Sequence, residues 1–150
     1  MTKSLQSLRT REEGSSAVEL ALMLPFLVLM LVAAVDFGRG YYASIEVTSA
    51  AEAGALYGTL NSTDTAGMQA AAKLDAHDVS GLTAVATYGC ECSDGTTVVA
   101  SCTAQPTTCT NNPVNYVQVV TTATYTPILS FHGISTNYPL KSVARMRAGN

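Results

Sequence analysis

The sequence predicts an α+β fold in which a long N-terminal helix packs on a small antiparallel β-sheet, with one further helix. Three observations predict it: an apolar run that continues with helical periodicity, a second and shorter helical pattern, and alternating apolar positions in the C-terminal half. The length of 150 residues suits one domain. Charged residues are only 13% of the chain, against about 25% in average soluble proteins, because a long segment near the N-terminus has almost none.

That segment, Ala17–Val35, has the length of a membrane span. Its nineteen residues include one charge, Glu19, and as a helix they measure about 28 Å, against about 30 Å of hydrocarbon. Basic residues near the ends of a span mark the cytoplasmic side, so the N-terminus is expected to stay in the cytoplasm. Three precede the span and one follows it closely: Lys3, Arg9 and Arg11, then Arg39.

Beyond the span, the helical pattern continues without a proline to Tyr57. A helix over Ser15–Tyr57 would have forty-three residues and a length of about 65 Å, so half of it should stand outside the bilayer. This outer half is rich in Ala, Gly and Ser, which predicts close packing on its own domain and leaves another face for subunits. Six positions near heptad spacing are Val35, Gly38, Tyr42, Ile45, Ser49 and Leu56.

The remaining elements are shorter. Asn61–Asp64 is typical of a helix stop followed by a new N-cap, and it predicts a second helix over Thr65–Val79. Alternation predicts four strands, with a turn at Asp94-Gly95 and a loop over Gln105–Pro113. The strands are Leu82–Tyr88, Thr96–Ser101, Tyr116–Tyr125 and Leu140–Arg147; one face of the third is Val117, Val119, Thr121, Ala123 and Tyr125.

All four cysteines follow the predicted span, which favours disulfides in an exported domain. A zinc site is the alternative, but the usual Cys-x2-Cys spacing is missing. Cys90 and Cys92 are too close in sequence to bond to each other on a strand. Two pairings remain, and we expect the nested one, with Cys90 bonded to Cys109 and Cys92 to Cys102.

Glu19 is the most unusual residue of the span. An ionisable group in hydrocarbon costs about 2.5 to 3.5 kcal/mol, so its presence indicates a function and a partner. A polar segment ending at Gly14-Ser15 precedes it.

Four segments of the chain together match a known pattern: Arg11–Phe26 (REEGSSAVELALMLPF), Val35–Arg39 (VDFGR), Ala51–Tyr57 (AEAGALY) and Lys141–Arg147 (KSVARMR). They resemble the TadE-like pseudopilins of the tight adherence (Flp, type IVc) pilus systems. The resemblance is close over the first helix and loose over the last strand, and it does not cover the cysteine region.

The resemblance implies a pilin-like fold and a processing step. A membrane prepilin peptidase would cut after Gly14 on the cytoplasmic side, so residues 1–14 form a leader and Ser15 becomes the N-terminus. Glu19 is then the fifth residue, and its partner would be the new α-amino group of Ser15 in the same or a neighbouring subunit. Two departures from related pilins are Ser15, where phenylalanine is common in type IVa pilins, and Leu20, where tight adherence prepilins often have an aromatic residue.

The resemblance also implies the organisation and the partners. Residues 15–60 would form the long helix, spanning the inner membrane once at 17–35, and residues 61–150 a disulfide-bonded domain in the periplasm or, within a pilus, outside the cell. The partners would be the peptidase, other pilins or pseudopilins and the assembly platform in the inner membrane. The expected role is pilus assembly, adhesion and biofilm formation.

An alternative is a secreted domain whose ordinary signal peptide is cut near Ala34, after Val32-Ala33-Ala34. The apolar run of sixteen residues exceeds the usual 7 to 15, and three glutamates precede or enter it. We expect no enzyme, cofactor or metal site, because His77 and His132 are isolated and no catalytic or phosphate-binding motif is present. Without the leader, five Lys or Arg face nine Asp or Glu, a net charge of −4, which argues against nucleic acid.

Overall fold

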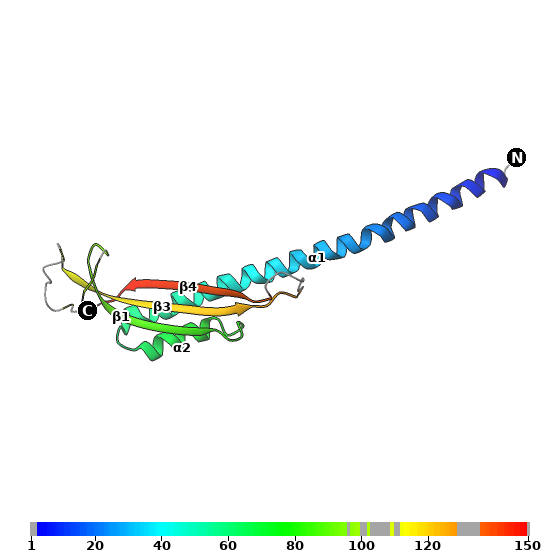
Figure 1. Ribbon diagram of the computed structural model, residues 1–150. Helices are drawn as coiled ribbons and strands as arrows, with labels where there is room; N and C mark the ends of the chain where they lie inside the picture. The colour runs from blue at the N-terminus through cyan, green and yellow to red at the C-terminus, as the bar shows by residue number, and fades with distance from the viewer. Residues whose placement is uncertain are drawn as a thin grey trace. The chain divides into compact units, whose positions relative to one another are not determined.

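The computed structural model describes residues 3–95, 97–99, 102, 109, 112–128 and 136–149, with side chains from Gly14 onward (Figure 1). The chain divides into two compact units, Met1–Arg39 and Gly40–Asn150, and the first helix contributes to both. The predicted α+β class is confirmed. The described elements are α1 (Lys3–Leu60), α2 (Thr65–Asp75), β1 (Thr83–Cys92), β2 (Val98–Val99), β3 (Pro113–Tyr125) and β4 (Tyr138–Arg147).

The sheet of the second unit has the strand order β2-β1-β3-β4, and every neighbouring pair is antiparallel. The central strand β3 pairs with β1 from Thr83↔Thr122 to Cys92↔Pro113, and with β4 from Tyr116↔Arg147 to Tyr125↔Tyr138. Residues that are paired across these three strands lie on the same face of the sheet. The two faces can therefore be assigned residue by residue.

One face of the sheet packs against α2 and the part of α1 that follows Gly40. The alternate residues Val117, Val119, Thr121 and Ala123 of β3, which were predicted to share one face, are buried. The buried Thr121 hydroxyl donates a hydrogen bond to the Val47 carbonyl oxygen of α1 at 2.7 Å, so its polar atom is satisfied in the core. The helices contribute mostly small side chains to this core: Val47, Ala50, Ala51 and Ala55 from α1, and Met68 and Ala72 from α2.

The small residues in the outer half of α1 pack on the domain, as predicted, and its large apolar residues lie on another face. Tyr42, Ile45 and Leu56 are 57%, 48% and 63% exposed, whereas Ala50, Ala51, Gly54 and Ala55 are buried. The reason is space: α2 and β3 approach α1 so closely that a Cβ on Gly54 would lie 2.7 Å from the Met68 carbonyl oxygen. The heptad positions therefore mark the outer face of α1 in the second unit.

Element boundaries differ from the predictions at several points. α1 begins at Lys3 instead of Ser15. α2 ends at Asp75 instead of Val79, because Ala76 closes the helix by donating its backbone N–H to the Ala72 carbonyl. β1 continues past Tyr88 through both of its cysteines, and Tyr88 is exposed. Of the strand predicted over Thr96–Ser101, Val98–Val99 is observed, and most of the predicted loop Gln105–Pro113 lies outside the described residues.

A polar contact fixes the corner between α1 and α2. Asp64 caps α2, since its Oδ1 accepts a hydrogen bond from the Gly67 N–H at 2.9 Å. The Tyr57 hydroxyl at the end of α1 donates to Oδ2 of the same carboxylate at 2.8 Å. The Gly67 N–H and then the Tyr57 hydroxyl hold the pKa of Asp64 below its usual value, because both stabilise the charged form.

This corner should make the folded domain sensitive to acid. A carboxylate whose pKa is lower in the folded state stabilises the fold above the pKa of the unfolded chain, and the contribution is lost as the pH falls through the folded value. Asp64→Ala should therefore lower the Tm at neutral pH, and the difference from wild type should shrink toward about pH 3. Thermal melts of the two full-length proteins across this range check it; a difference that stays constant with pH would contradict it.

Candidate cleavage and assembly site

Gly14 and Ser15, the residues of the predicted cut, lie inside α1 and are exposed. A Cβ on Gly14 would meet nothing within 4 Å, so the position is open on all sides. The peptide bond is in helical conformation, hydrogen-bonded within α1. A protease that binds its substrate extended would have to unwind this turn.

Glu19 is exposed on the same helix, four residues after Ser15. Residues spaced by four lie on one face of a helix, so the future amino terminus and the carboxylate lie on the same side of α1. Among the described side chains, the ion pairs are His77 with Asp78 and Arg145 with Glu91, and neither involves Glu19. The carboxylate is therefore available for a partner outside the described part of the chain.

The helix around Glu19 has the composition of a membrane span. Within the described residues, the segment Gly14–Leu60 is the one helix long and apolar enough to cross a bilayer, with a mean hydropathy of 2.6 in its best window. Large apolar side chains on all sides are exposed, among them Leu22, Phe26 and Met30. Pro25 lies within this helix without ending it.

The four cysteines form two disulfides at the far end of β1, but in the crossed arrangement. Cys90 is bonded to Cys102 and Cys92 to Cys109, with Cα–Cα distances of 5.4 and 5.5 Å, so the nested pairing was wrong. The register places Val99 of β2, three residues before Cys102, opposite Cys90.

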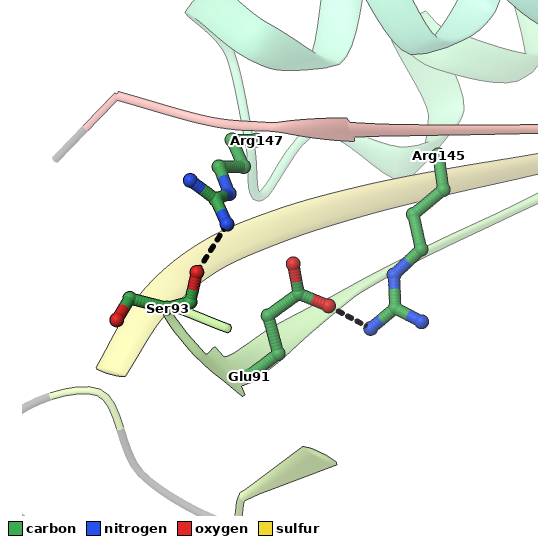
Figure 2. Close-up of polar contacts among 4 residues, drawn as sticks. All are labelled: Glu91, Ser93, Arg145 and Arg147. Atoms are coloured by element: carbon green, nitrogen blue, oxygen red, sulfur yellow. Dashed lines mark hydrogen bonds and ion pairs between the residues drawn. The ribbon is translucent and has the colours of Figure 1, made fainter. Parts of the chain in front are cut away.

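Next to the disulfides lies a charged cluster that sequence reasoning missed (Figure 2). Glu91, between the two cysteines of β1, is only 6% exposed and forms an ion pair with Arg145 of β4. The Arg145 guanidinium lies over the Tyr116 ring, 3.8 Å from its centroid, and Arg147 donates to the Ser93 carbonyl oxygen. The sequence feature that could have revealed this cluster is the alternation of basic residues along β4. It places them on the same face of the sheet as the acidic residue of β1.

The described residues show no arrangement that could hold a metal ion. His77 is exposed and contacts the carboxylate of its neighbour Asp78 at 2.9 Å, while His132 lies outside the described residues.

The long apolar N-terminal helix, which continues into a small α+β domain, fits a single-pass membrane protein of a pilus system. Residues 14–56 match the model of a protein family described as TadE-like protein, which confirms the identification as TadE-like for this segment. The family is one of structural pilus components rather than enzymes, and it implies contacts with other pilus components. Searches of curated proteins and of solved structures gave no significant match.

Proposed function

We propose that this chain is a pseudopilin of a tight adherence pilus, processed by a prepilin peptidase after Gly14 and assembled through its N-terminal helix. The observation that carries the proposal is where the family match lies: it begins at Gly14 and continues to residue 56. The matched segment thus starts at the residue that would end the leader, and it contains Ser15, Glu19 and the whole apolar run. The domain that follows lies outside the match.

In this proposal the membrane holds the substrate in place for the cut. Residues 17–35 span the inner membrane, residues 1–14 remain cytoplasmic with their basic side chains, and the domain from residue 61 is periplasmic. Cutting before the apolar run removes the leader and leaves the anchor. Local unwinding at Gly14 is inexpensive, since glycine costs a helix about 1 kcal/mol relative to alanine.

The cut then supplies the charge that Glu19 lacks. The α-amino group of Ser15 is protonated near neutral pH, and it forms within one helical turn of the glutamate. A buried charge is tolerated when it is paired, and such a pair can fix the register between neighbouring helices. Adhesion and biofilm formation would be consequences of the pilus and not of chemistry carried out by this chain.

The observations disfavour the secreted alternative. A signal peptidase cut near Ala34 would divide α1, which continues without interruption to Leu60, and would remove nearly half of the matched segment. The disulfides are compatible with either pathway, since both export the domain.

The N-terminus of the mature protein tests the proposal. In cells that contain the peptidase, mass spectrometry should find a protein starting at Ser15, and cells without the peptidase should retain the full chain. Gly14→Leu should also retain the leader, because the added side chain blocks the close approach of the protease. A mature protein starting near Val35 would establish secretion instead and refute the proposal.

A further inference from the structure

The sheet has a second face that no described element covers. Both helices pack on the face that contains Val117 and Val119. On the opposite face the register aligns Val85, Val120 and Val143 in one row across β1, β3 and β4. Val85 and Val143 are 58% and 51% exposed, and such exposure is unusual for valines in a sheet. We call this surface the sheet face; it is completed by Thr83, Thr87, Gln118 and Thr122 and by the basic side chains of β4.

The charges of the second unit are segregated between this face and the helices. Apart from Lys73, every Lys and Arg after Arg39 lies on the sheet face, at the alternate positions Lys141, Arg145 and Arg147 of β4. Glu91 neutralises part of this charge through Arg145, which leaves the face positive. The domain as a whole has more acidic than basic residues, so its negative charge is located elsewhere.

Part of that negative charge, Glu46 and Glu52, flanks the outer face of α1. This α1 face consists of Tyr42, Ile45, Ser49 and Leu56, and in a helix with 3.6 residues per turn Glu46 and Glu52 lie on its two sides. Glu46, and more weakly Asp78, raise the pKa of Tyr42, so the carboxylates lie near its hydroxyl. The α1 face is thus an apolar strip with acidic borders, and the sheet face is an apolar row with a basic border.

We propose that the sheet face of one subunit docks on the α1 face of a second copy of this chain. This pairing places valines against Tyr42, Ile45 and Leu56 and brings Lys141 and its neighbours to Glu46 and Glu52. Sheet against sheet would oppose two basic strands, and α1 against α1 would oppose two acidic borders, both of which are unfavourable. The charge pattern therefore selects a heterologous contact, and such a contact repeats as an open helical array if its rotation does not close a ring.

The inference rests on the proposed function, because an open array is useful to a protein that assembles into a filament. It adds the partner, a second copy, and the two surfaces that meet. It is also independent of the proposed pairing of Glu19 with the Ser15 α-amino group, since it involves only side chains of the second unit.

Cysteine cross-linking in membranes tests the docking with the full-length chain. Two differently tagged copies are expressed together, one with Val143→Cys and the other with Ile45→Cys, and mild oxidation should link them. The matched control replaces Ile45→Cys by Asn61→Cys, an exposed position off the α1 face, and should give at least fivefold less mixed dimer. The native cysteines do not interfere, because all four are already in disulfides.

Charge reversal tests the chemistry of the contact. Lys141→Glu on the Val143→Cys copy should reduce the mixed dimer at least fivefold, and Glu46→Lys with Glu52→Lys on the other copy should restore it. Lys141 suits this purpose because it is exposed, whereas Arg145 and Arg147 also hold β1 and its turn. Lys73→Glu makes the same change of charge at an exposed position of α2, and it should leave the cross-link unchanged.

Dominant cross-linking of Val143→Cys to itself would overturn the proposal in favour of a symmetric contact, and so would a mixed dimer no stronger than the Asn61 control. Both outcomes differ from failure of the proposed function. If the protein is processed at Gly14 and the cells carry pili, but the mixed dimer does not form, the docking alone is refuted. A protein that starts near Val35 would refute the pseudopilin function whatever the cross-links show.

Discussion

Glu19→Ala should abolish pilus assembly while the leader is still removed at Gly14. The variant keeps the apolar run and lowers the cost of placing it in the bilayer, so anchoring and cleavage are unaffected. What it loses is the partner of the Ser15 α-amino group, which would then be buried unpaired between neighbouring helices. An unpaired charge costs about 2.5 to 3.5 kcal/mol, and about 1.4 kcal/mol corresponds to a factor of ten in an equilibrium constant. Subunit association should therefore fall about 100-fold.

The measurement compares pili sheared from cells with the processed protein remaining in membranes. Glu19→Gln should behave like alanine, because the amide has nearly the same shape without the charge. Glu13→Ala is the matched control: it removes an acidic residue that the cut discards, and it should leave pili at the wild-type level. Normal pili from the Glu19→Ala strain would show that the glutamate has no role in assembly.

Gly54→Ala should destabilise the second unit, although alanine normally favours a helix over glycine by about 1 kcal/mol. A Cβ at this position would lie 2.7 Å from the Met68 carbonyl oxygen and 3.1 Å from Ala72 and Val119. The nearest of these atoms is backbone and cannot rotate away, so α1 has to move from α2 and β3. Overpacking of this kind typically costs about 1 to 3 kcal/mol, or several degrees of Tm.

Thermal melts of the purified full chain in detergent measure the effect. Gly38→Ala is the control within the same helix, because a Cβ there meets nothing within 4 Å, and it should leave the Tm unchanged or raise it slightly. If the two variants melted alike, the close approach of α1, α2 and β3 at Gly54 would be ruled out.

The main elements could be predicted from local patterns, because each pattern reports one physical constraint. Alternation in β3 predicted that Val117, Val119, Thr121 and Ala123 share one face, which is the buried one, and the cap at Asp64 predicted the start of α2. The membrane-length run, Glu19 and the boundary at Gly14 are also local features, and the family match covers all of them. The candidate site was therefore found before the fold.

Three features required the fold. The composition of α1 predicted that its small residues pack on the domain, but the close contacts of Gly54 with α2 and β3 follow only from the fold. The disulfide pairing depends on distances between segments of the chain, which composition does not specify. The Glu91–Arg145 pair joins residues far apart in sequence across β3.

The sequence by itself thus determined that the chain has a membrane-length helix with a carboxylate near its start, a polar segment ending at Gly14-Ser15 and an α+β domain with four cysteines, because these depend on neighbouring residues. Only the tertiary structure decided which cysteines bond, which residues of α1 make the closest contacts and how the charges separate onto two faces. These depend on distances between segments remote in sequence, and they are set by how closely backbones approach and by strand register.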